Sequence, residues 1–566
     1  MPTVEYIAKC IRQARGLEAA DLVLKNVRIF NLTDGSFTQG DIAICGDRIV
    51  GVGENYEGRA VMDCSGLTAV PGFMDAHVHV ESSLITPYEF ERCVLPHGTV
   101  TAICDPHEIS NVCGPAAIEY FLDCAANMRM DLLVALSSCV PATDMETAGS
   151  SITCEDLRSF ADKPCVAGLA ELMNVPGVLN LDPYVLAKIE QFYGNIDGHA
   201  PLLGGKDLNA YLAAGVGNDH ECSQLDEAKE KLRKGMAVFI REGSVARNLD
   251  ELMPLVTIEN APFLAFCTDD RNPKDIAENG HIDGMVARCL AAGCNPLAVY
   301  RTACLSPAQQ RNLKYKGLVA PGYFADIVLL SDFDKCQVSA VICKGRLVNE
   351  ELFASRKPEP STELFRNSVK CKKVKAEDFR IVTDKTEMPV IGIRELSLLT
   401  DYLKMDMPAG EKKADVSRDI AKIAVLERHG KNGNRALGFV HGFKMQKGAI
   451  ASTVGHDSHN ICVVGMNDED MACAVNALID AQGGFAVAID GKVIGLGPLP
   501  LGGLMSDKDS KTVHDYCGQL QNAAKKTGCP LEAPFLQLAF LPLPVIPFLR
   551  ITDKGVFDVS AWSFVH

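Results

Sequence analysis

The chain is organised around one stretch, Pro71-Gly-Phe-Met-Asp-Ala-His-Val-His-Val-Glu-Ser-Ser83. Its two histidines, His77 and His79, follow the apolar run Leu67–Val70 and are two residues apart. Residues i and i+2 of a β-strand point to the same face, so both imidazoles would project together from one strand end. Two imidazoles on one face can bind one metal ion. The stretch therefore predicts a metal site, whereas the histidine pair taken alone would equally fit a strand with a polar outer face.

The composition limits the class of protein. The chain has 566 residues, 47% of them hydrophobic, which is enough for two or three domains with ordinary cores. The formal net charge of −16 argues against a nucleic-acid partner. The 22 cysteines form no close CxxC pair, which is typical of a reducing compartment rather than of a disulfide-stabilised secreted protein.

Two stretches bear on targeting. The N-terminal residues Met1–Gly16 read as a short amphipathic helix without the apolar centre of a signal peptide. Phe535–Leu549 is the most apolar stretch, but it is short and contains three prolines, so it does not read as a membrane span. We therefore expect a soluble, cytoplasmic protein with no membrane partner.

Short strands and turns flank the central part of the chain. A hairpin is predicted around Gly46-Asp47, and a second hairpin around Asp490-Gly491 follows a helix over Asp468–Ala481. The charged residues 350–377 read as a linker or a solvated excursion. We assign residues 1–70 and 315–350 to one small β-sandwich domain, residues 71–314 to a central domain and residues 378–566 to a C-terminal α+β domain.

The central domain alternates strand-like runs with helical stretches such as Pro183–Phe192. The eight runs lie near Thr68–Val80, Thr99–Asp105, Leu132–Val140, Val166–Leu172, Gly194–Asp197, Gly215–Asp219, Ala237–Arg241 and Phe263–Cys267. Eight such alternations over about 200 residues predict an α/β fold, a (β/α)8 barrel inserted in the small β-domain. A doubly wound sheet is the alternative.

Polar residues stand where these predicted strands end. They are His77 and His79, then Asp105, His107 and Glu108, then Glu171, His199, His220 and the pair Asp269-Asp270. The active site of a (β/α)8 barrel gathers at the carboxyl ends of its strands, so these side chains should meet. Five of the 13 histidines fall there, which a random scatter would rarely produce.

Four imidazoles and two carboxylates can hold two divalent ions, with one carboxylate bridging them. Such a pair lowers the pKa of a shared water and yields hydroxide near neutral pH. A carboxylate at strand eight could accept the proton of that water and pass it to a leaving group. Each residue also has a plainer interpretation: His199 or His220 as a polar loop residue, Glu171 as a buried ion-pair partner, Asp269 as a helix cap.

The same residues carry a family resemblance. The barrel pattern with its paired histidines and strand-eight Asp resembles the amidohydrolase superfamily. Within it, the opening stretch, Thr101-Ala-Ile-Cys-Asp-Pro-His-Glu-Ile109, Phe266-Cys-Thr-Asp-Asp-Arg271 and Thr453-Val-Gly-His-Asp-Ser-His-Asn-Ile461 look like the bacterial adenine deaminase family. The likeness extends over essentially the full length. It implies purine salvage by hydrolysis of adenine to hypoxanthine and ammonia, with Mn2+ or Fe2+ as the metal and Zn2+ as a further possibility.

The resemblance also implies roles at the metal site. His77, His79 and Asp269 would hold the first ion, and His199 and His220 the second. Glu171 would bridge them, where many superfamily members use a carboxylated lysine; residues 166–173 contain no lysine. Asp269 would shuttle the proton. Asp270 is the alternative, although strand alternation predicts that Asp269 faces the metals and Asp270 the following helix.

Further candidates surround this set. His107 is a candidate catalytic residue that, with Asp105 and Glu108, could instead bind substrate, hold a further metal or support the ligands. Candidate substrate contacts are Glu81, Ser82 and Ser83, with helix capping as the alternative, and Arg241 and Glu242, with an internal ion pair as the alternative. His456, Asp457 and His459 would form a lid over the chain's own barrel or a partner's, unless they are a surface turn.

Two other functions remain open at this point. A cyclic amidohydrolase of the dihydroorotase type would favour a strand-four lysine, and a metal-free scaffold would lack part of the ligand set. We expect adenine as a small-molecule partner and a homo-oligomer, a dimer or larger.

Overall fold

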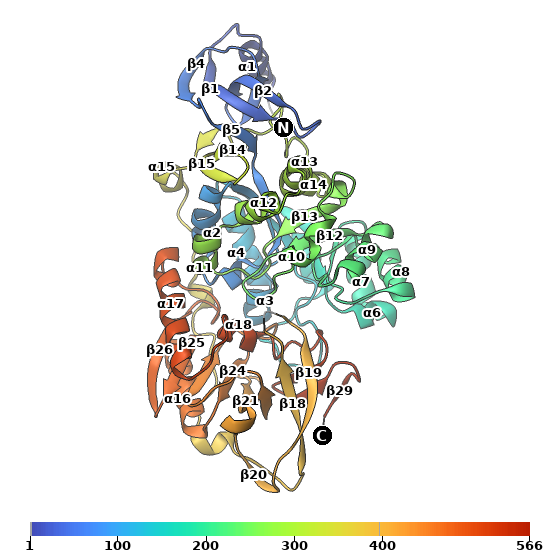
Figure 1. The fold of residues 1–566 in the computed structure, drawn as a ribbon, viewed down its shortest axis with the longest axis vertical. Helices are drawn as coiled ribbons and strands as arrows, with labels where there is room; N and C mark the ends of the chain where they lie inside the picture. The colour runs from blue at the N-terminus through green and yellow to red at the C-terminus, as the bar shows by residue number, and fades with distance from the viewer. Residues whose placement is uncertain (1–2, 396, 566) are drawn as a thin grey trace.

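The computed structural model describes residues 3–395 and 397–565. Figure 1 shows three parts along the long axis: a β-domain at one end, the barrel in the middle and the C-terminal domain at the other end. The helices α3 (His107–Cys113) and α18 (Pro534–Ala539) lie where the barrel meets the C-terminal domain (Figure 1).

The small β-domain is one eight-stranded sheet made from both flanks of the barrel. Strand β5 pairs with β1 on one side and β14 on the other, so the chain leaves this sheet to build the barrel and then returns to it. The hairpin predicted at Gly46-Asp47 is confirmed by the pairing of Cys45 with Arg48. Its strands are β1 (Ala20–Phe30), β2 (Phe37–Cys45), β3 (Arg48–Val52), β4 (Gly58–Asp63), β5 (Thr68–Pro71), β14 (Ile327–Asp332), β15 (Gln337–Cys343) and β16 (Arg346–Leu347), with α1 (Val4–Ala14) beside β2 and β3.

The predicted (β/α)8 barrel is confirmed. Its strands are β6 (Phe73–Val78), β7 (Thr99–Cys104), β8 (Asp131–Leu136), β9 (Val166–Leu172), β10 (Ile196–Gly198), β11 (Asn218–Asp219), β12 (Ala237–Arg241) and β13 (Leu264–Cys267). They pair in parallel as β10-β9-β8-β7-β6 and β11-β12-β13. Parallel bridges from Val78 to Asp269 and from Ile196 to Val216 join the two sheets into a ring. All eight carboxyl ends therefore open on one mouth.

Helices surround the barrel as α2 (Pro87–Val94), α3, α4 (Pro115–Ala125), α5 (Cys154–Phe160), α6 (Val175–Leu179), α7 (Pro183–Phe192), α8 (Gly205–Ala213), α9 (Leu225–Arg233), α10 (Leu249–Leu252), α11 (Pro273–Asn279), α12 (Ile282–Ala291), α13 (Pro296–Tyr300) and α14 (Ser306–Gln310). The start of α7 shows why sequence located it well. Pro183 occupies the first turn, where its missing N–H costs nothing, and Asp182 accepts hydrogen bonds from the backbone of Tyr184 and Val185.

The C-terminal domain is built on an eight-stranded sheet in the order β19-β18-β22-β21-β24-β23-β25-β26. These strands are β18 (Glu387–Ile393), β19 (Thr400–Asp406), β21 (Ile420–Leu426), β22 (Arg435–His441), β23 (Ala449–Ser452), β24 (Ile461–Gly465), β25 (Gly484–Ile489) and β26 (Lys492–Pro498). Around it are β17 (Ile381–Thr383) and β20 (Gly410–Lys412), β27 (Leu549–Thr552), β28 (Gly555–Asp558) and β29 (Ser563–Phe564), α16 (Asp468–Ala481), α17 (Ser510–Lys526) and α18. The helix and hairpin predicted at Asp468–Ala481 and Asp490-Gly491 are confirmed.

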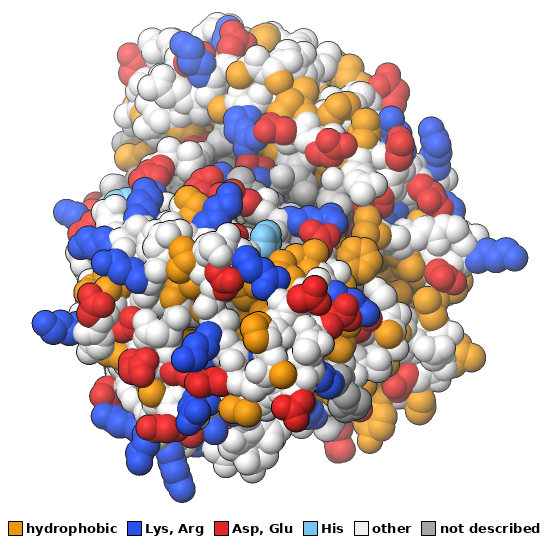
Figure 2. Space-filling view, turned by 60° about the horizontal axis from the view of Figure 1, so that its bottom comes forward, with side chains coloured by type: hydrophobic (Ala, Val, Ile, Leu, Met, Phe, Trp, Pro, Cys, Tyr) orange, Lys and Arg blue, Asp and Glu red, His pale blue; other side chains and the backbone are white. Residues whose placement is uncertain are grey.

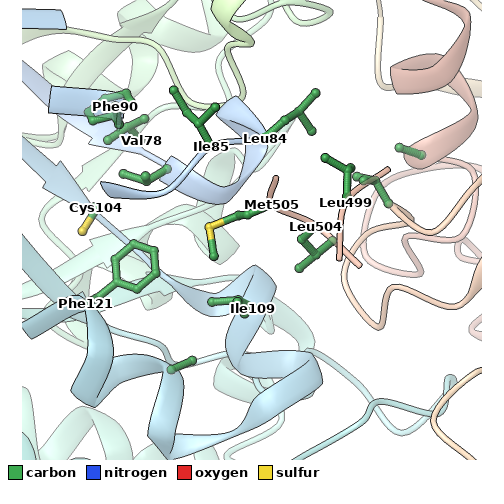
Figure 3. Packing of buried hydrophobic residues seen from close by; sticks show 14 of the residues in the cluster. Val78, Leu84, Ile85, Phe90, Cys104, Ile109, Phe121, Leu499, Leu504 and Met505 are labelled. Atoms are coloured by element: carbon green, nitrogen blue, oxygen red, sulfur yellow. The ribbon is translucent and has the colours of Figure 1, made fainter. Parts of the chain in front are cut away.

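The barrel and the C-terminal domain share a hydrophobic core. Met505, from the segment after β26, lies among the barrel residues Leu84, Ile109 and Phe121 (Figure 3). The predicted linker is also packed: Arg356, beyond α15 (Glu350–Ala354), forms an ion pair with the buried Glu91. The expectation of a solvated excursion is therefore wrong for that part, because its side chains complete the barrel's outer surface.

The surface of the molecule mixes charges of both signs. Figure 2 shows acidic and basic side chains interspersed over the face that includes the C-terminal domain, without a large patch of one sign on that face. Among the described residues, no helix combines the length and the apolar character needed to cross a bilayer.

Candidate active site

Six of the predicted residues converge at the mouth of the barrel. His77 lies in β6 and His79 follows it, Glu171 lies in β9, and His199 and His220 follow β10 and β11. Asp269 lies two residues beyond β13. All six residues are buried, with at most 4% of the residue exposed. The alternation that places His77 and His79 on one face is the strand geometry from which the site was predicted.

The two oxygens of Glu171 face two different histidine pairs. Its Oε1 lies 3.1 Å from His79 Nε2 and 3.6 Å from His77 Nε2. Its Oε2 lies 2.6 Å from His199 Nδ1 and 3.4 Å from His220 Nε2. Asp269 Oδ1 lies on the first side, 3.2 Å from His79 Nε2 and 3.4 Å from His77 Nε2. One carboxylate thus stands between two groups of ligand-type atoms, which is the arrangement a bridging ligand needs.

These spacings fit bound divalent cations. Nitrogen and oxygen ligands bind transition metals at about 2.0–2.2 Å, so two ligands of one ion lie roughly 3–3.5 Å apart. His77 Nε2 and His79 Nε2 are 3.1 Å apart, within that range. His79 directs its Nδ1 to the carbonyl oxygen of Asp105 at 3.0 Å, which leaves Nε2 as the ligand atom. The donor set of imidazoles and carboxylates suits Mn2+, Fe2+ or Zn2+.

The electrostatics of the cluster depend on its opposed charges. Burial alone would raise the pKa of Glu171, but the neighbouring His199 and His220 hold it well below its usual range. Burial alone would lower the pKa of His79, but Asp269 and Glu171 raise it well above its ordinary value. When the histidines are neutral, the two carboxylates give the cluster a net negative charge. This is also the protonation state in which histidines bind cations.

Asp269 is divided between two partners. Its Oδ2 accepts a hydrogen bond from Arg241 Nη1 at 2.9 Å, and its Oδ1 is left facing the histidines. Arg241 is in turn held by both oxygens of Glu221. Arg241, predicted as a substrate contact, thus orients the strand-eight carboxylate. Glu221 was missed by sequence reasoning, although its position directly after His220 was a usable signal.

The prediction that Asp270 faces the following helix is wrong. Asp269 has a φ of +56°, in the left-handed region, and β13 has already ended at Cys267. The alternation of a regular strand therefore does not extend to Asp270. Its carboxyl group lines the same cavity as Asp269, and burial, with the charge of Asp269, raises its pKa.

Four predicted substrate contacts lie elsewhere. Glu242 forms ion pairs with Arg288 and accepts from the backbone of Leu249, so the internal ion pair is the geometry observed. Glu81 accepts from the N–H of Ile109 in the first turn of α3, at 3.1 Å. Ser83 donates to the carbonyl of Val80 within its own turn, and Ser82 lines a different cavity. The side chains of Glu81, Ser83 and Glu242 bond to local backbone groups of helix ends and turns.

His107 lies at the edge of the cluster. Its Nδ1 is 2.8 Å from Asp105 Oδ2 and 3.5 Å from Glu171 Oε1, so Asp105 fixes its ring. Its Nε2 lies 3.2 Å from Glu108 Oε1. His107 therefore touches the Glu171 carboxylate and also lines the cavity.

The C-terminal domain reaches this chain's own barrel. His456 Nδ1 lies 2.6 Å from Glu108 Oε1, and His459 Nε2 lies against the other oxygen of Glu108. Glu108, in the first turn of α3, thus joins the loop between β23 and β24 to the barrel. Asp457, between the two histidines, is 1% exposed, and burial raises its pKa to about 7. The loop is a buried closure of the mouth, not a surface turn.

Part of the cavity wall is apolar. It is formed by Leu398, Phe540, Leu543 and Ile546, together with Met173 of the barrel. Three of these residues belong to Phe535–Leu549, the most apolar stretch of the sequence. The ring of Phe540 stacks on His456 with 4.2 Å between ring centroids and an interplanar angle of 1°, which fixes the imidazole. Sequence reasoning excluded this stretch from the membrane but did not connect it with the site.

The barrel and its cluster of ligand-type residues define a hydrolase of the amidohydrolase type. A sequence model of the amidohydrolase family matches residues 68–348, and one described as the adenine deaminase C-terminal domain matches residues 397–563. Divalent metals are typical of amidohydrolases, and the chain has the side chains to bind them.

Named relatives resolve the family further. The chain is 52% identical over 564 residues to "Adenine deaminase 1" of Rhizobium meliloti, covering 99% of this chain and 100% of the relative. It is 54% identical over 563 residues to "Adenine deaminase" of Cereibacter sphaeroides, covering 99% of each. The chain belongs to the adenine deaminase family.

Proposed function

We propose that this protein hydrolyses adenine to hypoxanthine and ammonia, as a step of purine salvage. Water adds at C6 of the purine, the C6–N bond breaks, and the 6-amino group leaves as ammonia. The observation that carries the proposal is Glu171, whose two carboxylate oxygens face two histidine pairs in a chain 52% identical to a named adenine deaminase.

The metal roles follow from that division. His77, His79 and Asp269 would hold the first ion, His199 and His220 the second, and Glu171 would bridge them, with manganese or iron as the metal and zinc as the alternative. When bound, the two cations supply an activated water for the attack. The spacing of Asp269 Oδ1 from both His77 and His79 supports this assignment.

Asp269 is proposed to move the proton. A group that takes a proton from water and returns it to the departing amine must reach both within one hydrogen bond. Oδ1 of Asp269 faces the cluster, and Arg241 holds Oδ2, so the carboxylate cannot rotate away without losing that contact. His107 is proposed to support the site through its contacts with Asp105 and Glu171.

The C-terminal domain is proposed to exclude water. His456, Asp457 and His459 close the mouth, and Phe540 with its apolar neighbours covers the space beside the ligands. A closed, dry site strengthens the electrostatic interactions that act on the reacting groups. The free thiols of all 22 cysteines fit a reducing compartment, so we place the reaction in the cytoplasm.

The dihydroorotase-type alternative loses support at β9. The strand Val166–Leu172 carries Glu171, whose oxygens face both histidine pairs, and contains no lysine that could be carboxylated.

The direct test is ammonia release by the Mn2+-reconstituted protein over a panel of purines, pyrimidines and cyclic amides. We expect adenine to be converted to hypoxanthine at the highest kcat/KM of the panel. Hydrolysis of a cyclic amide without ammonia release from adenine would contradict the proposal.

A further inference from the structure

Six residues that line the cavity each carry a buried polar atom without a hydrogen bond to any of the described residues. Three of these atoms, Glu108 Oε2, His199 Nε2 and His220 Nδ1, belong to the proposed metal site and its support. The other three are Asp270 Oδ1, Asp457 Oδ2 and His456 Nε2. Their residues are 7%, 1% and 2% exposed. Buried polar atoms are nearly always hydrogen-bonded, because leaving one unsatisfied is costly. Three such unpaired atoms around one cavity therefore point to a ligand that forms hydrogen bonds with them.

The surroundings define the chemistry of that ligand. Leu398, Leu543 and Ile546 offer an apolar surface, while Asp457 of the C-terminal domain and Asp270 of the barrel add carboxyl groups to the lining. Carboxylates accept hydrogen bonds, so the ligand must present N–H groups along its edge and apolar faces. A free purine base has both: an exocyclic amine on the six-membered ring and an N–H on the five-membered ring.

The two carboxylates lie beside different residues of the site: Asp270 beside His79, a proposed metal ligand, and Asp457 beside His107. Asp270 follows Asp269, and its carboxyl group is grouped closely with His79 and Glu108. Asp457 comes from the C-terminal domain and lies beyond His107, whose Nε2 is 3.8 Å from Asp457 Oδ1 and whose Nδ1 is 3.5 Å from Glu171 Oε1. Since C6 must lie against the metal ligands for deamination, the five-membered ring is directed away from them, toward Asp457.

We propose that Asp457 accepts a hydrogen bond from the N–H of the purine's five-membered ring, and that this contact selects free bases over N-substituted purines such as nucleosides. The inference rests on the proposed deamination and assigns substrate specificity to the C-terminal domain. A nucleoside has no proton at the substituted nitrogen, so it would leave the buried carboxylate unpaired. Sites built to hydrogen-bond a substrate N–H reject analogues that lack it by large factors.

The contacts of His456 and His459 with Glu108 explain how Asp457 is held in place. His456 and His459 flank Asp457 and both contact Glu108, and Phe540 stacks on His456. The loop is therefore fixed on both sides of Asp457 before substrate arrives, so little ordering cost falls on binding. Asp457 is a binding residue in this account, and His456 and His459 position it.

The test compares kcat/KM for adenine, 9-methyladenine and 7-methyladenine in the Mn2+-loaded full chain. Each methyl group blocks the N–H of one ring tautomer. We expect the wild type to discriminate against at least one methylated base. In Asp457→Ala, the ratio of adenine to that base should fall at least about tenfold, mainly because adenine is used less well. Asp457→Asn keeps the side-chain volume and should shift the ratio in the same direction. It therefore tests the hydrogen bond even if the alanine variant does not fold.

Asp553→Asn is the matched control. Asp553 is also a buried acid of the C-terminal domain facing the barrel, where it accepts from the backbone and hydroxyl of Thr147, but it does not line the cavity. Its ratio should equal that of the wild type. An unchanged ratio in both Asp457 variants, or an equal shift in Asp553→Asn, would overturn the inference while leaving deamination intact. Failure of the metal-loaded wild type to release ammonia from adenine would overturn the proposed function instead.

Discussion

The barrel side of the cavity and its C-terminal side differ in chemistry and in how their positions are fixed. The barrel side holds Glu171, Asp269 and four histidines, each at or just beyond the end of a strand. The C-terminal side holds apolar side chains from a proline-broken segment and one loop with Asp457. In the proposed function, the barrel would supply metal binding and proton transfer, and the C-terminal domain would shape the space for substrate and exclude water from it.

Replacing Glu171, which faces both histidine pairs, should have the largest effect on activity. Glu171→Gln keeps the shape but removes the charge that faces both histidine pairs, so the protein should lose metal and activity together, by roughly a thousandfold or more. Metal analysis and steady-state ammonia release would measure this. Retention of two ions with near-normal activity would reduce Glu171 to a structural residue.

Substitutions of Asp269 and Asp270 should distinguish an effect on the chemical step from an effect on substrate binding. Asp269→Asn should lower kcat by at least about a hundredfold, in line with general acid–base contributions. Asp270→Asn should cost less in kcat and act more on KM, because Asp270 lines the cavity in which substrate is proposed to bind. Both variants are compared at matched metal content. A dead Asp270→Asn beside a nearly normal Asp269→Asn would reverse the assignment.

Arg241 should act through Asp269. Arg241→Gln removes the contact with Asp269 Oδ2 and frees the carboxylate to rotate, so kcat should fall roughly ten- to a hundredfold, as for other residues that orient ligands. KM should change little, because Arg241 does not touch the cavity. A rise in KM at constant kcat would return Arg241 to the role of substrate contact.

Lowering the pH should reduce the stability of the folded protein through His429 in the C-terminal domain. Its Nε2 donates to the carbonyl of Ser458 at 2.7 Å, and burial together with the charge of Arg428 lowers its pKa from 6.5 to about 3. The unfolded chain therefore binds a proton that the folded chain does not, and stability is lost as pH falls from 6.5 toward 3.

The expected cost is roughly 2 kcal/mol of unfolding free energy between neutral pH and about pH 5. The measurement is Tm at both pH values for the wild type and for His429→Gln, which retains a donor and cannot titrate. The variant should lose less Tm on acidification; an equal loss in both would show that other groups control this range.

The residues on the barrel side of the cavity could be predicted from the sequence, whereas those in irregular segments could not. The barrel strands and the set of six metal-type residues could be predicted because side-chain direction in regular strands repeats every two residues, as at His77 and His79. Asp270 could not, because Asp269 leaves the strand in a left-handed conformation. Phe540 and Leu398 could not either, because their place in the site arises from packing between segments far apart in the chain.

The shared core also changes how the C-terminal domain can be tested. Removing the chain from about residue 378 would strip Met505 from the barrel residues around it, so a truncated protein would lose core packing as well as the loop over the site (Figure 3). Point substitutions at Asp457 and Asp269 therefore test the comparison more cleanly than deletion.

The central claim is that two cations, joined by Glu171, are needed for the reaction. The most direct measurement is a titration of the metal-free protein with Mn2+ while ammonia release from adenine is followed. Activity should rise until two ions are bound per chain and then stay constant. Full activity at one ion per chain, or activity in the metal-free protein, would contradict it.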